Sequence, residues 1–267
     1  MRLLLMMLLG CALPVQAAHR LSLSWTNNLL TLTGPEVPGG SLQLWYLEAF
    51  CRGGSTHRRW EETTLPHRTE WVKGNSQSIE LLTRVEPGVR IRHRITVRKD
   101  GVDFDLEMVN EGREPSPIQW FQPCLRVGAF TGKDQETYPG SCFIFTAQGP
   151  VRLDQLPRTE EALYRGGQVY VPRGIPTNDV NPRPISTVRP VNGLIGAVSA
   201  DQKKLVAMAW SRAQELFQGV IVCIHSDPRV GGLAPGERKK LRGKLYLMDN
   251  DPKALLRRHR RDFPGSF

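Results

Sequence analysis

Several features are scarce in this chain of 267 residues, and each scarcity excludes a class of protein. No apolar run approaches the roughly 20 residues that a membrane-spanning helix needs. The chain has only five cysteines, but it is long enough to bury a sizeable core, so folding does not require disulfides. No C-x-x-C pair is present, and no zinc site of the usual ligand spacing is found.

Acidic residues are also in the minority, since 36 Lys and Arg stand against 26 Asp and Glu, a formal net charge of +10. Such an excess favours acidic partners. Nucleic acid is not expected among them, because the chain lacks the basic stripe interleaved with aromatics that single-stranded binders use for stacking. An acidic glycan or a charged cell surface fits the charge, and so does a solvated basic surface.

The N-terminus has the pattern of a secretory signal peptide. Arg2 precedes the apolar run 3–9, and small and turn-forming residues follow as far as Ala17. We therefore expect a signal peptide over 1–17, a single domain over 18–267, and a secreted or periplasmic location. A lipoprotein signal, in which Cys11 carries the lipid, is the rival interpretation.

Four cysteines remain after such a cleavage, and three pairings are conceivable if all are bridged. An exported protein can form disulfides. Each cysteine nevertheless lies within an apolar, strand-like run, where a buried free thiol fits equally well. The sequence leaves the pairing open for Cys51, Cys124, Cys142 and Cys223.

Alternation of apolar and polar residues dominates the chain, most clearly at 89–98 and 102–108. Asp100-Gly101 between them predicts a two-residue hairpin turn. That turn predicts a register that pairs Val97 with Phe104, Ile95 with Leu106, His93 with Met108, Arg98 with Asp103 and Arg94 with Glu107.

Further short strands are predicted along the chain, separated by turn signals. They cover residues 21–25, 29–33, 42–50, 78–85, 118–127, 142–146, 168–171, 194–199, 205–210, 217–225 and 241–247. Many strands and few helices indicate a β-sandwich. Segment 152–192 is rich in Pro, Arg and Gly and predicts long loops across one face.

One helix is predicted, at the C-terminus. Asp251 suits its N-cap and Pro252 its first position, and residues 257–261 place basic side chains at the end that favours cations. We expect Leu255 and Leu256 to hold it against a sheet.

Two segments resemble the catalytic stretches of one known family. Residues 109–112 form an Asn-containing turn before Trp120-Phe-Gln-Pro-Cys-Leu-Arg, and Val222-Cys-Ile-His-Ser-Asp-Pro leads into Leu233-Ala-Pro-Gly-Glu. Their order and spacing over residues 80–247 resemble galactose-mutarotase-like (aldose 1-epimerase-like) proteins. The resemblance implies an all-β supersandwich of antiparallel strands with long loops and a short C-terminal helix.

The resemblance also shows where this chain departs from the family. Gln122 stands before Pro123, where the family has its catalytic histidine, and His225 stands where the family has its catalytic glutamate. Epimerisation needs a base for the hydroxyl proton and an acid for the ring oxygen. Glutamine cannot act as an acid, so ordinary mutarotase chemistry is not expected, although His225 can serve as a base with another partner.

We therefore expect a groove that holds a sugar through polar and aromatic side chains. The alternative for each is a structural role in the core, a turn or a hydrogen-bonded network. The candidate ligand-binding residues are Gln122, His225, Arg126, Arg52, His67, Trp120, Glu48 and Arg165.

Three functions follow from these residues. The first is an exported carbohydrate-binding protein that lacks ordinary epimerase chemistry. The second is a carbohydrate-active enzyme, an epimerase, hydrolase or lyase, with His225 as general base and Glu48, Glu215 or Asp227 as its partner. The third is a cell-envelope module that binds an acidic polymer through its basic surface. None of the three implies a cofactor or a metal, and the glycan and the oligomeric state stay open.

Overall fold

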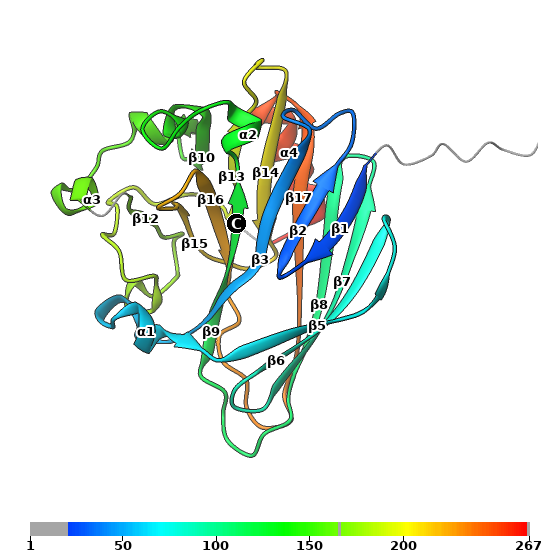
Figure 1. Ribbon diagram of the computed structural model, residues 1–267. Coiled ribbons are helices and arrows are strands. Elements are labelled where there is room, and N and C mark those ends of the chain that lie inside the picture. The colour runs from blue at the N-terminus through cyan, green and yellow to red at the C-terminus, as the bar shows by residue number, and fades with distance from the viewer. Residues whose placement is uncertain (1–20, 165–166, 266–267) are drawn as a thin grey trace, which may run out of the picture.

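Two antiparallel β-sheets pack face to face in the computed structural model, which describes residues 21–164 and 167–265 (Figure 1). The predicted antiparallel β-sandwich is confirmed. Its main core lies between the sheets, where aromatic rings stack in succession from one sheet to the other. Tyr46 stacks on Phe104, and Phe104 and Phe121 both contact Trp210. Such rings contribute both buried area and specific geometry to a core.

The eight-stranded sheet has the order β1-β2-β3-β9-β16-β15-β12, with β4 paired to β3. Its strands are β1 (Ser22–Thr26), β2 (Leu29–Thr33), β3 (Ser41–Arg52), β4 (Thr64–Leu65), β9 (Ile118–Arg126), β12 (Val169–Tyr170), β15 (Ala213–Gln218) and β16 (Cys223–Pro228).

The nine-stranded sheet has the order β11-β10-β13-β14-β17-β8-β7-β6-β5. Its strands are β5 (His67–Gly74), β6 (Ser78–Val85), β7 (Val89–Arg98), β8 (Gly101–Asn110), β10 (Cys142–Thr146), β11 (Gly149–Arg152), β13 (Ile195–Val198), β14 (Lys204–Trp210) and β17 (Arg238–Asp249).

The predicted hairpin forms between β7 and β8, but the predicted register is wrong by two residues. Arg98 pairs with Gly101, so Lys99 and Asp100 form the turn. Gly101 instead begins β8 with φ of 140°, and a Cβ there would collide with the backbone oxygen of Leu245 on β17. The glycine therefore serves the close approach of β8 to β17 rather than the turn. The observed pairs are Val97 with Val102, Ile95 with Phe104, His93 with Leu106 and Arg94 with Asp105.

The single strand predicted over 217–225 is also wrong, because the chain turns there and forms the hairpin of β15 and β16. The turn contains Gly219 and two exposed apolar residues, Val220 and Ile221. Their apolar character made the run look continuous. The hairpin brings Glu215 opposite Asp227, a pairing that one long strand could not produce.

The C-terminal helix α4 (Pro252–Asp262) confirms the predicted N-cap. The Asp251 carboxylate accepts a hydrogen bond of 2.9 Å from the backbone N–H of Ala254. Leu255 is buried in a second apolar cluster that lies against the nine-stranded sheet, on residues such as Phe143 and Leu205. Helix α4 therefore covers part of the sheet face that points away from the main core.

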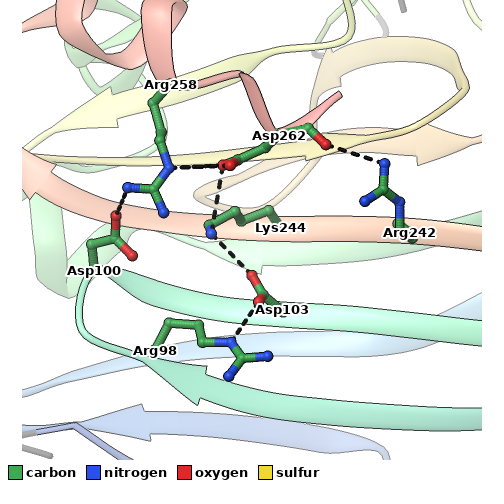
Figure 2. Close-up of polar contacts among 7 residues, drawn as sticks. All are labelled: Arg98, Asp100, Asp103, Arg242, Lys244, Arg258 and Asp262. Carbon is green, nitrogen blue, oxygen red and sulfur yellow. Dashed lines mark hydrogen bonds and ion pairs between the residues drawn. The ribbon is translucent and has the colours of Figure 1, made fainter. Parts of the chain in front are cut away.

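Ion pairs fasten α4 to this face (Figure 2). Arg258 contacts Asp100 at 2.7 Å and Asp262 at 3.0 Å. Lys244, on β17, lies 3.0 Å from Asp103 and 3.5 Å from Asp262. The charge network consists of Arg98, Asp100, Asp103, Arg242, Lys244, Arg258 and Asp262.

Short helices interrupt the connections between strands. They are η1 (Ser55–His57), α1 (Trp60–Thr63), α2 (Gly128–Thr131), η2 (Tyr138–Ser141), η3 (Leu153–Gln155), α3 (Glu160–Tyr164) and η4 (Thr177–Asp179). Within residues 21–164 and 167–265, no helix combines the length and the apolar character that crossing a membrane requires. The predicted signal peptide over 1–17 lies outside the described residues.

The long connection 152–192 has little regular structure, as predicted. It includes the two-residue strand β12 and lies beside β15 in Figure 1. Its part 172–192 crosses the outer face of the eight-stranded sheet. Asn181 reaches Gln122 on β9, and Asp179 contacts Arg229 just beyond β16 at 3.5 Å. This part of the connection, called the cap segment 172–192, covers polar side chains on β9 and next to β16 on that face.

Candidate functional site

Polar side chains gather on the outer face of the eight-stranded sheet, beneath the cap segment. Cys223 pairs with Arg126 across β16 and β9, and the isolated bridge between Trp120 and Arg229 continues the same register. That register sets His225 beside Cys124, and paired residues of an antiparallel ladder share one face. It also sets Asp227 beside Gln122, while Glu215 and Phe217 join from β15. The buried polar patch is defined as Gln122, Cys124, Glu215, Cys223, His225 and Asp227, each at most 4% exposed.

A proline and a bulge shape one edge of this patch. Pairing of β3 with β9 is interrupted between Trp45, opposite Cys124, and Ala49, opposite Gln122. Pro123 lies at this break and has no N–H to donate to the ladder. The extra residues of β3 form a bulge there. The bulge brings Glu48 to Gln122, whose Nε2 donates to Glu48 Oε2 at 3.0 Å.

The cap segment closes over the patch through Asn181. Its side-chain amide donates to Gln122 Oε1 at 3.0 Å, and its backbone N–H donates to Glu215 Oε2 at 2.9 Å. The Arg183 guanidinium carbon lies 5.1 Å from the centre of the Phe217 ring. Gln122 and His225 are therefore on one face of neighbouring strands, as the hypothesis required, but this structure holds them beneath a lid rather than in an open groove.

His225 makes one hydrogen-bonding contact, lies near a carboxylate and is stacked on a ring. Nε2 lies 3.3 Å from the Sγ atom of Cys223, and Nδ1 lies 3.7 Å from Oδ1 of Asp227. The Phe217 ring stacks on the imidazole at 4.1 Å with an interplanar angle of 8°. This arrangement leaves the ring little freedom to turn.

The charges of the patch shift one another. Burial works to lower the pKa of His225, but Cys223 and Asp227 outweigh it and raise that pKa to about 10. A hydrogen bond with Cys124, together with the charge of His225, lowers the pKa of Cys223 to about 5 against the opposing effect of burial. Both shifts favour the charged forms of these side chains, a thiolate and an imidazolium, over the neutral forms.

The two carboxyl groups shift in the opposite direction. Burial raises the pKa of Asp227 to about 7. Burial, followed by the charge of Asp227, raises the pKa of Glu215 well above its usual range. Two acids held side by side away from water cannot both ionise readily. The patch therefore retains a proton near neutral pH and can exchange it.

The other predicted residues lie in several places. Trp120 is fully buried on the patch face and packs with Ala49 and Cys51, and Arg126 is exposed at the end of the same face. Arg52 ends β3 and is half-buried. His67 is not brought to the patch, since its ring nitrogens lie 3.3 Å from the backbone oxygens of Leu65 and Leu47. Arg165 lies outside the described residues.

Sequence reasoning missed Asn181, Arg183 and the role of the cysteines. In the pattern Cys223-x-His225-x-Asp227, alternation along a strand places a thiol, an imidazole and a carboxylate on one face. This spacing could have indicated from the sequence that the three side chains act together. Cys124 became a neighbour only through pairing across strands. All four described cysteines are free thiols in this structure.

A surface cavity of about 540 Å³ adjoins the patch, lined by Ser41, Gln43, Arg126, Gly128, Ala129, Ile221 and Val222. Two of these residues are neighbours of Cys223 in the patch. Val222 precedes it in the chain, and Arg126 is its cross-strand partner. A small molecule could therefore approach the patch from this end of the strands as well as beneath the cap segment.

Comparison with known proteins finds a likeness in fold. A galactose mutarotase-like protein from Lactobacillus casei is 8% identical, with 85% of this chain and 99% of the other covered and a TM-score of 0.44. Galactose 1-epimerase from Lactobacillus acidophilus is 10% identical, covering 86% and 98%, with a TM-score of 0.39. An α-N-acetylgalactosaminidase from Bifidobacterium bifidum is 12% identical, covering 91% and 37%, with a TM-score of 0.48.

No family model and no curated protein matches the chain. The solved structures that are similar to it thus include the mutarotase-like proteins whose resemblance two strand segments predicted.

Proposed function

We propose that this is an exported carbohydrate-binding protein that holds its ligand on the buried polar patch, beneath the cap segment 172–192, and lacks ordinary epimerase chemistry. One observation carries the proposal. Gln122 and His225 lie on a common sheet face among buried groups whose hydrogen-bonding capacity is partly unused. Nδ1 of His225, both carboxylate oxygens of Asp227 and Nε1 of Trp120 have no hydrogen-bond partner among the described residues.

Unused donors and acceptors suit a ligand with many hydroxyl groups. Leaving buried polar atoms unpaired costs about 1 to 3 kcal/mol each, and a sugar can donate to and accept from such atoms in turn. Trp120 lies on the same face and contributes an aromatic ring, a kind of side chain that commonly lines small-molecule sites. The patch therefore offers hydrogen-bonding groups that a sugar can use and that the protein itself leaves without partners.

Binding requires the cap segment to move, and its contacts with the patch are polar. Asn181 contributes two of them, to Gln122 and to Glu215. Sugar hydroxyls can replace such hydrogen bonds at small net cost, because hydrogen bonds are exchanged rather than lost. Lid movements of this kind commonly accompany ligand entry.

A carbohydrate-active enzyme is the second candidate, favoured by the contact of 3.7 Å between Asp227 and His225. A pKa of His225 raised to about 10 makes the ring an acid rather than the expected base at neutral pH. In this reading, His225 donates a proton, and the carboxyl pair of Glu215 and Asp227 accepts one. Gln122 takes no part in proton transfer.

The test is a screen of neutral and acidic glycans for thermal stabilisation of the full chain, followed by titration of any that stabilise it. We expect binding to be abolished when Gln122→Ala and His225→Ala are combined. His57→Ala combined with Gln148→Ala is the matched control, because both residues are exposed and distant from the patch in sequence.

Three results would contradict the proposal or redirect it. Binding that both double variants retain would exclude the patch. Glycan affinity that falls steeply with salt and is unchanged in the patch variants would favour a basic surface that holds an acidic polymer. Conversion of the bound glycan, detected by chromatography and lost in Asp227→Asn, would establish the enzyme instead.

A further inference from the structure

Three side chains of the buried polar patch present atoms that bind soft metal ions. Cys124 comes from β9, and Cys223 and His225 come from β16. Their ligand atoms all lie within 4.8 Å of one another, and all three residues are buried. The Sγ atom of Cys223 and Nε2 of His225 are 3.3 Å apart.

We propose that Cys124, Cys223 and His225 bind a thiophilic metal ion through two sulfurs and one imidazole nitrogen. Metal–sulfur bonds of about 2.3 Å and metal–nitrogen bonds of about 2.0 Å hold tetrahedral ligand atoms about 3.5 to 4 Å apart. Sγ of Cys223 and Nε2 of His225 are 3.3 Å apart, and no two of the three ligand atoms are more than 4.8 Å apart. Small side-chain rotations are therefore enough to bring the three atoms to metal-binding distances. This site goes beyond the proposed sugar site, although it lies in the same patch and shares His225 with it.

The surroundings of His225 match those of a metal ligand. Asp227 lies 3.7 Å from Nδ1, on the side of the ring opposite Nε2. Ligating histidines commonly present their second nitrogen to a carboxylate, which fixes the ring orientation and its basicity. Phe217 stacks on the ring and fixes its plane. Nε2 is therefore directed at the two cysteines.

Gly219 leaves the space beside these ligand atoms free. It lies opposite Cys223 in the hairpin, and its backbone N–H donates to the Cys223 carbonyl oxygen at 2.9 Å. A Cβ at this position would collide with Sγ of Cys223 and lie 3.2 Å from Nε2 of His225. Any larger residue would therefore fill the position between thiol and imidazole.

Sheet geometry favours a metal over a disulfide. Cys223 pairs with Arg126, so Cys124 is its diagonal neighbour and not its direct partner. Diagonal neighbours are about 7 to 8 Å apart, somewhat less between Cβ atoms, whereas a disulfide needs a Cβ separation of about 3.5 to 4.5 Å. A metal ion between the sulfurs spans the longer distance.

Charge balance indicates which ion fits. Binding displaces two protons, one from Cys124 and one shared by the Cys223–His225 pair, so two thiolates and a neutral imidazole surround the ion. With Zn²⁺ the net charge of this group is zero, which suits a site away from water. With Cu⁺ one negative charge remains. We therefore expect Zn²⁺ to bind, and Cu⁺ to be the second ion that the same sulfurs accept.

The experiment titrates the reduced full chain with Zn²⁺ against a chromophoric chelator, and with Cu⁺ under anaerobic conditions. Co²⁺ then serves as a spectroscopic probe, because its thiolate charge-transfer band reports sulfur ligation. We expect one ion per chain, the thiolate band, and a loss of affinity of at least 100-fold in Cys124→Ala and Cys223→Ala. We expect a loss of about 10- to 100-fold in Asp227→Asn.

Cys142→Ala is the matched control, because Cys142 is equally buried but lies in the main core. If a cysteine variant fails to fold, Gly219→Ala tests the same site with both thiols present, and we expect it to block the ion. Absence of binding to the reduced chain would overturn the proposal. Binding without the thiolate band, or binding unaffected by Cys124→Ala and Gly219→Ala, would also overturn it. Metal binding by an unmodified chain that binds none of the glycans would count against the proposed function alone.

Discussion

Each sheet carries a polar cluster on the face that points away from the main core, and the two clusters differ in how their charges are matched. In the charge network of Figure 2, each of the three acids lies against a base. In the buried polar patch, Asp227 lies near His225, but Glu215 lies opposite Asp227, so one acid faces another. The first arrangement stabilises the docking of α4. The second is unfavourable for stability, which is typical of sites built for binding or chemistry.

The largest expected effect breaks the matched cluster. Lys244 is 7% exposed and lies within 3.5 Å of both Asp103 and Asp262. Lys244→Met leaves each acid, itself partly buried, with one remaining and more exposed base, Arg98 or Arg258. We expect the free energy of unfolding to fall by about 2 to 3 kcal/mol, somewhat less than when a buried charge loses its whole partnership. Urea denaturation measures this change.

Lys240→Met is the control on the same strand. Its ion pair with Glu107 is 2.9 Å long but exposed on both sides, so solvent already screens it. We expect little change in stability. Equal losses in the two variants would mean that burial of the charge network contributes nothing.

The second prediction concerns His93, a buried histidine of the main core whose pKa is shifted in the opposite direction to that of His225. His93, between the sheets, is 2% exposed, and its Nδ1 and Nε2 lie 3.1 and 2.9 Å from the hydroxyls of Tyr46 and Thr83. Burial lowers the pKa of His93 to about 3. The unfolded chain binds a proton near pH 6.5 and the folded chain does not. Stability is therefore lost as pH falls from about 6.5 towards 3.

Removing that histidine should flatten the pH dependence. Between pH 7 and pH 5, we expect the wild type to lose roughly 2 kcal/mol more than His93→Gln, at about 1.4 kcal/mol for each pH unit below the unfolded pKa. Unfolding free energies at the two pH values measure the difference. His57→Gln, at an exposed position, is the control and should follow the wild type. Parallel curves for wild type and His93→Gln would show that His93 is protonated in the fold.

Periodicity predicted most strands of both sheets and the C-terminal helix, because these depend on local residue choice. The registers were less accessible. Gly101 seemed to belong to a turn, but its use is set by β17, which is more than 130 residues away. Val220 and Ile221 made a turn look like a strand. Local patterns do not contain such long-range requirements.

The site was predicted in part, for the same reason. Gln122 and His225 were found from their place in two strands, and they do lie on one face. Cys124 joins His225 only because β9 and β16 pair, and Asn181 reaches Gln122 from a loop without periodicity. Burial beneath the cap segment could not be read from the strands, because it depends on where that loop crosses the sheet.

The smallest expected effect concerns the unmatched cluster and has the opposite sign to the first. Glu215→Gln removes one of the two facing carboxyl groups, while the new amide oxygen can still accept from the backbone N–H of Asn181. We expect the free energy of unfolding at pH 8 to rise by about 1 kcal/mol, because burial and Asp227 disfavour the ionised form that the Glu215 carboxyl group adopts freely in the unfolded chain. Chemical denaturation at fixed pH measures the gain.

Glu237→Gln tests whether the gain belongs to the patch. Glu237 also accepts from a backbone N–H, that of Ala234, but it faces Lys239 rather than an acid. We expect a small loss there. If Glu215→Gln also loses stability, the carboxyl pair is a structural network that the fold requires. A gain in Glu215→Gln alone would mean that the fold carries this acid pair at a cost, and a ligand that uses its hydrogen-bonding groups is then the simplest physical reason for the pair.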